Sequence, residues 1–116
     1  LPGAGSVVIE PTRALVAVDV NTGGDTSPAA GLTANIAAAK ALPRLLRLRG
    51  LGGQITVDFA PLPKKDRRQL EQALRVAFRA DSVETALVGW TPLGHFEAQR
   101  KRPRLPLDRP VLEALA

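Results

Sequence analysis

Cysteine is absent from the sequence, which excludes disulfide bonds and any metal site built on thiolates. We therefore expect a reducing, cytoplasmic environment. Aromatic side chains are scarce, at three Phe and one Trp, so the core must consist mostly of Leu, Val, Ile and Ala. No apolar run approaches the roughly 20 residues that cross a bilayer, and residues 1–5 do not begin a signal peptide. These first residues resemble a position inside a longer chain, and we expect further segments on both sides.

What the sequence does contain is enough for one compact domain. Its 116 residues and hydrophobic fraction of 45% are typical of a single globular unit with its own core. The formal net charge is +5, which suits a polyanionic partner such as nucleic acid or an acidic membrane surface. Charge alone does not choose between these partners, and many basic domains carry their excess on a solvated face.

The first half of the chain predicts a hairpin followed by a helix. Residues 6–10 (SVVIE) and 14–20 (ALVAVDV) are strand-like, and the turn between them is short enough for antiparallel pairing. From Leu32 apolar residues recur three or four apart, which indicates a helix that ends at the glycines of residues 50–53. Pro43 lies inside this helix, and because it removes a backbone donor we expect it to kink the helix or divide it in two.

The second half continues the alternation of strands and helices. Residues 54–59 (QITVDF) alternate as a strand, residues 64–80 have an amphipathic helical pattern, and residues 83–90 form another long strand. This order predicts an α/β fold. We expect one domain with a mixed sheet of about four to five strands, an N-terminal hairpin and two main helices.

Two acidic positions are candidates for chemistry. Asp19 ends the most hydrophobic strand and shares a face with Asn21 if the strand continues. Asp58 lies within a strand, where a carboxylate costs stability unless it is paired or binds a metal. A local turn for Asp19 and Asn21, and a salt bridge to an arginine for Asp58, are the alternatives. Two carboxylates on core strands also suit Mg²⁺, which takes one or two carboxylates and retains water ligands.

Basic residues gather at two places, where they close the first helix and crowd the C-terminal tail. They are candidates for binding phosphates, and a solvated face is the competing explanation. The set consists of Arg44, Arg47, Arg49, Arg100, Lys101, Arg102 and Arg104. His95, the single histidine, has no Ser or Cys arrangement around it, and we interpret it as surface or core filling. No P-loop, dinucleotide fingerprint or zinc pattern occurs.

An ordered series of segments carries a family resemblance. LPGAGSVVIEPTRALVAVDVNTGG, LTANIAAA, RLLRLRGLGGQITVDF and LGHFEAQRKRPRLPL resemble the ribonuclease E/G family, in the region called its deoxyribonuclease-I-like subdomain. The similarity extends over residues 1–107, which we interpret as the catalytic subdomain. Residues 108–116 read as a helical stub that leads toward segments outside this sequence.

The resemblance implies a function and a set of roles. Asp19 and Asp58 match two aspartates that coordinate one catalytic Mg²⁺, and Asn21 matches an asparagine that helps orient that site. Such an enzyme is a metal-dependent endoribonuclease that hydrolyses single-stranded RNA to 5′-phosphate and 3′-hydroxyl ends. The family's RNA-binding, end-sensing, zinc-linking and dimerisation segments are not in this sequence. We therefore expect weak or no activity from the isolated chain, with any homo-oligomer formed by the full-length enzyme.

The sequence also departs from the family pattern. Ala37 stands where a glutamate is usual, and Pro43 lies in a helix that is normally unbroken. Pro61 replaces an acid, and Glu84 lies where basic residues are usual. We interpret these departures as signs of altered substrate handling. The alternative function is a non-catalytic RNA-binding module that keeps the fold, although the retained acids favour catalysis because a binder gains nothing from acids that face phosphate.

Overall fold

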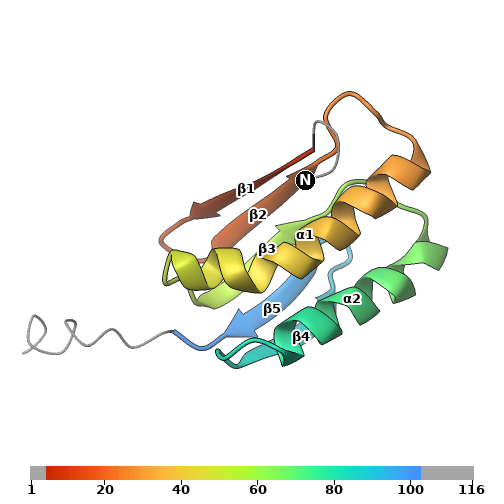
Figure 1. The fold of residues 1–116 in the computed structure, drawn as a ribbon. Coiled ribbons are helices and arrows are strands. Elements are labelled where there is room, and N and C mark those ends of the chain that lie inside the picture. The colour runs from red at the N-terminus through yellow and green to blue at the C-terminus, as the bar shows by residue number, and fades with distance from the viewer. Residues whose placement is uncertain (1–4, 103–116) are drawn as a thin grey trace, which may run out of the picture.

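The computed structural model describes residues 5–102, in which five strands and two α-helices alternate along the chain (Figure 1). Their order is β1 Ser6–Pro11, β2 Val16–Asn21, α1 Pro28–Leu48, β3 Gly53–Asp58, the 3₁₀ turn η1 Lys64–Asp66, α2 Arg67–Arg79, β4 Thr85–Trp90 and β5 Phe96–Arg100. These strands form one mixed sheet in the order β1-β2-β3-β5-β4. The predicted α/β fold is confirmed, while Arg104 and the predicted stub at residues 108–116 lie outside the described residues.

The strand directions follow from the connections. A tight turn, in which the Thr12 backbone N–H donates to the Leu15 carbonyl oxygen at 2.8 Å, joins β1 to β2 in the predicted antiparallel hairpin. α1 then returns the chain to the end of the sheet at which β2 begins, so β3 lies parallel to β2. On its other side β3 pairs antiparallel with β5, and β4 completes that edge through a hairpin with β5.

Both helices cover the same face of the sheet, and neither α1 nor α2 lies over the other face (Figure 1). The alternation of side chains along the strands creates this division. In β2, for example, Val16, Val18 and Val20 are buried, while Asp19 and Asn21 are exposed on the opposite face. The core between the two layers is mostly aliphatic, as the composition predicts. Within residues 5–102, neither helix has the length and apolar character needed to cross a membrane.

The start of α1 has the capping residues that a helix requires. The Ala30 backbone N–H donates to Ser27 Oγ at 3.2 Å, and Pro28 occupies the first turn, where a missing N–H costs no helical hydrogen bond. Of the two outcomes expected at Pro43, division of the helix is wrong, because α1 continues through it to Leu48. Pro43 is buried against the core, and we attribute the continuity of the helix to this packing, which offsets the backbone bond that proline removes.

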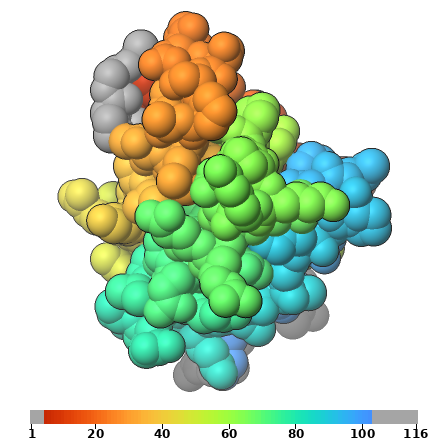
Figure 2. Space-filling view, turned by 90° about the vertical axis from the view of Figure 1, so that its right-hand side faces the viewer, coloured from red at the N-terminus to blue at the C-terminus, as the bar shows by residue number. Residues whose placement is uncertain are grey.

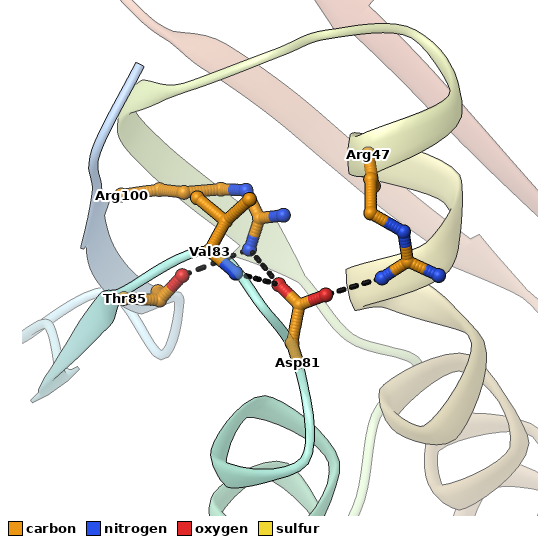
Figure 3. Close-up of polar contacts among 5 residues, drawn as sticks. All are labelled: Arg47, Asp81, Val83, Thr85 and Arg100. Atoms are coloured by element: carbon orange, nitrogen blue, oxygen red, sulfur yellow. Dashed lines mark hydrogen bonds and ion pairs between the residues drawn. The ribbon is translucent and has the colours of Figure 1, made fainter. Parts of the chain in front are cut away.

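A buried ion-pair network fixes the turn after α2 to the rest of the fold (Figure 3). Asp81 accepts a hydrogen bond from Arg47 of α1 and one from Arg100 of β5, the latter at 2.8 Å. The side chains of Asp81 and Arg100 are both 0% exposed. Arg100 also donates to Thr85 Oγ1 of β4 at 2.9 Å. One carboxylate therefore joins α1, the turn after α2 and the two strands at one edge of the sheet.

Candidate active site

Asp19 and Asp58 lie beside each other at the carboxyl ends of neighbouring parallel strands. In the pairing of β2 with β3, Asp19 is the direct partner of Asp58. Neighbouring strands are separated by roughly 4.8 Å, so the two carboxylates project from adjacent positions of one face. This is the face that neither α1 nor α2 covers, both acids are exposed on it, and Asn21 lies on it two residues beyond Asp19.

The residues of this face fit a hard divalent cation. Carboxylate and amide oxygens are the ligands that Mg²⁺ prefers, and the ion usually keeps several of its waters. Within residues 5–102, neither acid pairs with a lysine or arginine, and His95 lies beside Asp58. No group of three or more His, Cys, Asp and Glu side chains suited to a metal occurs in that part of the chain. The candidate centre is therefore a two-carboxylate site whose remaining ligands must come from an amide, water or substrate.

The segment that follows Asp58 is anchored to α1. Asn35 is fully buried, donates from Nδ2 to the Ala60 carbonyl oxygen and accepts from the Ala60 backbone N–H, both at 2.8 Å. One turn earlier, Gly31 allows a close approach, because a Cβ at this position would lie 2.7 Å from the Pro61 carbonyl oxygen. These contacts hold the chain two residues beyond Asp58. Sequence reasoning did not assign this positioning role to Asn35.

His95 lies beside Asp58, with 3.8 Å between the imidazole Nε2 and the carboxylate Oδ1. It belongs to the turn between β4 and β5, where its backbone N–H donates to Thr91 Oγ1 at 3.0 Å. Sequence reasoning, which interpreted His95 as filling, did not find this contact. The proximity depends on the pairing of β3 with β5, which places Phe96 opposite Val57, and nothing in the local sequence indicates that pairing.

The basic residues proposed from the sequence lie at the opposite end of the sheet. Three of them close α1, which runs from the carboxyl end of β2 to the amino end of β3. β5 is antiparallel to β3 and pairs Arg100 with Gly53, so the residues after β5 emerge at the same end. The six residues of β3 separate this end from Asp58 by roughly 16 Å. Six members of the set lie within the described residues: Arg44, Arg47, Arg49, Arg100, Lys101 and Arg102.

Several of these side chains are also engaged within the fold. The structure corrects the assignment of Arg100 to RNA binding, because its side chain is buried and paired with Asp81 and cannot reach a phosphate. Three more have partners. Arg47 pairs with Asp81, Lys101 pairs with Glu84 at 2.9 Å, and Arg49 donates a hydrogen bond to the Ile9 carbonyl oxygen at 2.8 Å. Arg44 and Arg102 are exposed.

A different group of basic side chains lies at the acid end. Lys64, Lys65, Arg67 and Arg68, which we call the α2 basic segment, form η1 and the first turn of α2. Figure 2 looks onto this end, where the green residues around the start of α2 lie between the orange residues that follow β2 and the blue residues of the β4–β5 turn. The sequence shows four basic residues within five positions, but its helical pattern does not indicate at which end of the sheet they lie.

Fold and site together define a class of protein. The chain is an α/β domain that presents paired carboxylates, with basic side chains at the same end of the sheet, at the carboxyl ends of its parallel strands, where open sheets of this kind bind their ligands. Comparison with known families gives the particular one. The ribonuclease E/G family matches residues 1–103, and the chain belongs to that family, as the resemblance predicted.

Individual relatives agree with this membership. Ribonuclease G of Salmonella typhimurium is 39% identical over 113 residues, which cover 90% of this chain and 22% of the relative. Ribonuclease E of Nostoc sp. is 39% identical over 107 residues, which cover 88% of this chain and 16% of the relative. Ribonuclease E of Escherichia coli is 40% identical over 108 residues, which cover 88% of this chain and 10% of the relative. The chain therefore spans about a fifth or less of the length of these relatives.

Proposed function

We propose that the chain carries the catalytic centre of a Mg²⁺-dependent endoribonuclease, which hydrolyses single-stranded RNA to 5′-phosphate and 3′-hydroxyl ends. One observation carries the proposal: Asp19 pairs directly with Asp58 on two parallel strands, and Asn21 lies on the same uncovered face. Membership of the ribonuclease E/G family, whose similar members are named as ribonucleases, supports RNA as the substrate.

Each residue has a role that its chemistry allows. Asp19 and Asp58 hold the cation, which supplies Lewis-acid chemistry at the scissile phosphate when bound. The Asn21 amide both donates and accepts hydrogen bonds, and it orients a water or substrate oxygen beside the carboxylates. The contact of Asn35 with Ala60 keeps the end of β3, and so Asp58, in position. Within residues 5–102, both acids are exposed on the face that neither helix covers, and we propose that an extended RNA strand lies across them there.

Asp58→Asn is the direct test of this function. Asparagine has the same shape but lacks the charge that holds a hard cation. Cleavage by the variant should therefore fall to the level that the wild-type chain shows without Mg²⁺. Glu10→Gln is the matched control, because it removes a carboxylate charge from the same face near the amino end of β2. The assay is cleavage of a labelled single-stranded oligonucleotide with protein in excess, since the chain spans about a fifth or less of the length of its relatives and we expect it to cleave weakly. Full cleavage by Asp58→Asn would refute the metal assignment.

A second measurement tests the metal site without activity. Mn²⁺, a paramagnetic substitute for Mg²⁺, should broaden the NMR signals of the Asp19 and Asp58 backbone amides in the wild-type chain. Asp58→Asn should abolish the broadening, and Glu10→Gln should preserve it. The alternative function, a non-catalytic RNA-binding module, predicts RNA binding with neither broadening nor cleavage.

A further inference from the structure

An RNA strand that approaches Asp19 and Asp58 meets two carboxylates of its own sign. Positive side chains close to the acid pair would offset this repulsion in addition to a bound cation, because exposed charges further apart than about 8–10 Å are largely screened by physiological salt. The basic residues at the end of α1 and after β5 do not meet this need. They lie roughly 16 Å from Asp58 along β3, and most of them have partners inside the fold.

The α2 basic segment lies at the end of the sheet that carries the acid pair. It follows β3 after a short loop whose Ala60 is held on α1, so it begins at the end of the sheet that carries Asp58. Lys64, Lys65 and Arg68 are exposed. Within residues 5–102, none of the segment's four side chains takes part in an ion pair. Four basic residues and the intervening acid at position 66 give this stretch a net charge of +3.

Arg67 fixes the segment against the β4–β5 turn. Its guanidinium carbon lies 4.6 Å from the centre of the Trp90 ring, and Nη2 lies 3.6 Å from the position that a Cβ would occupy at Gly94. Trp90 packs in turn against Phe59 and Phe96, at ring-centroid distances of 5.9 and 5.3 Å. A guanidinium held on an aromatic face is already ordered, so it loses little side-chain entropy when it binds a phosphate.

The β4–β5 turn lies between this segment and the acid pair. Arg67 Nη2 lies 3.6 Å from the position that a Cβ would occupy at Gly94, the next residue is His95, and His95 Nε2 lies 3.8 Å from Asp58 Oδ1. In Figure 2 the start of α2 and the β4–β5 turn form one adjoining surface. The turn that carries His95 is therefore a neighbour of both Asp58 and Arg67.

We propose that the α2 basic segment binds the backbone phosphates of single-stranded RNA next to the acid pair, with Arg67 as its fixed member and Lys64, Lys65 and Arg68 as its adaptable ones. The proposal rests on the proposed function for the nature of its ligand. Contacts to phosphates carry no base information, so the affinity is independent of sequence and falls steeply with salt.

The test compares two triple substitutions that remove the same charge. One replaces Lys64, Lys65 and Arg68 with Ala, and the control replaces the exposed Arg44, Arg75 and Arg79 with Ala. Binding of a labelled oligouridylate is measured in EDTA, which prevents metal-dependent cleavage, over a series of salt concentrations. The slope of log K against log salt should shrink by roughly 2 in the first variant, at about 0.7 for each phosphate that the protein no longer neutralises. The control should keep the wild-type slope, and thermal melts should show both variants folded.

Trp90 supplies a second measurement at the site itself. It is the only tryptophan of the chain, so intrinsic fluorescence reports on the surface beside Arg67. The oligouridylate should change this emission in the wild type and the control, and much less in the Lys64, Lys65 and Arg68 variant. An equal reduction of the slope in both triple variants, or a wild-type emission that RNA leaves unchanged, would overturn the proposal. Asp58→Asn should keep both responses, so the failure of catalysis and the failure of this surface are distinguishable.

Discussion

Removal of the Asp81 carboxylate would leave the guanidinium of Arg100 buried without its counter-ion. Both side chains are 0% exposed, so water cannot replace the missing partner. Breaking a buried pair in this way costs about 3–5 kcal/mol. Arg100 retains its hydrogen bond to Thr85 Oγ1, which places the expected loss for Asp81→Ala near the lower limit, at about 3 kcal/mol. For a domain of this size the melting temperature should fall by roughly 10–15 °C.

A double substitution separates the buried charge from the general effect of the mutation. Asp81→Ala combined with Arg100→Met removes both charges, and replacement of a buried pair by apolar side chains is often neutral. The double variant should therefore regain most of the stability that Asp81→Ala loses. Arg47, whose side chain is 46% exposed, is the lesser partner, and Arg47→Ala should cost no more than about 1 kcal/mol.

Urea denaturation of the three variants measures these differences. The reasoning fails if Asp81→Ala loses less than about 1 kcal/mol, which is the size expected of an exposed pair. It also fails if the double variant is less stable than Asp81→Ala, because the unpaired charge of Arg100 would then not be the source of the loss.

The same pair gives stability a defined dependence on pH. Burial alone would raise the pKa of the Asp81 carboxyl, but the hydrogen bond and charge of Arg100, with the hydrogen bond from Arg47, outweigh it and hold the pKa below its ordinary value of 3.8. Because the folded pKa is the lower one, the stabilisation is complete above the unfolded pKa of about 3.9 and is lost as pH falls through the folded pKa. The difference in stability between wild type and Asp81→Ala should therefore be constant near neutral pH and shrink in acid.

Three further predictions concern positions elsewhere in the fold. Asn35→Leu should cost about 2–4 kcal/mol in urea denaturation, because the buried N–H and C=O of Ala60 lose their partners, and a loss under about 1 kcal/mol would contradict the anchoring role. The hydrogen bond and charge of Lys101 lower the pKa of Glu84, and NMR titration of Lys101→Ala should show this pKa back at its ordinary value. The melting temperature should not change, because the pair is exposed. Saturating Mg²⁺ should raise the melting temperature of the wild type but not of Asp58→Asn, and an equal rise in both would place the ion elsewhere.

Much of the fold is predictable because its signals are local. The apolar residues of β2 and the alternation in β3 result from burial of one strand face, and the short turn at Thr12 dictates a hairpin. β5 is not recognisable in the sequence, because Glu97, Gln99 and Arg100 give it the composition of a polar tail. Its polarity has two tertiary causes: neither α1 nor α2 covers one face of the sheet, and the arginine on the other face is neutralised by an aspartate 19 residues earlier in the chain.

The candidate site also contains residues that the local sequence indicates and contacts that only the tertiary structure creates. Asp19 and Asp58 could be proposed because a carboxylate at the end of an apolar strand is unusual wherever the strand lies. The contacts of Asn35 and His95 could not be predicted from the sequence. Each joins segments whose proximity is decided by the packing of a helix or by the pairing of distant strands. The location of the basic residues could not be predicted for a related reason. Charge runs are visible in a sequence, but the end of the sheet at which each run lies depends on strand direction.

The position of β3 in the middle of the sheet has a consequence for how the molecule opens. Backbone amides of edge strands exchange with solvent through low-energy local opening, whereas amides of enclosed strands need a larger opening. β1 and β4 are the edges of the described sheet, and the pairing of β4 with β5 shifts register between Leu87 and Gly89. Deuterium should therefore enter β4 and β1 first and β3 last. Asp19 and Asp58 belong to two strands that are both paired on either side, so the edges can open and close without separating the two carboxylates.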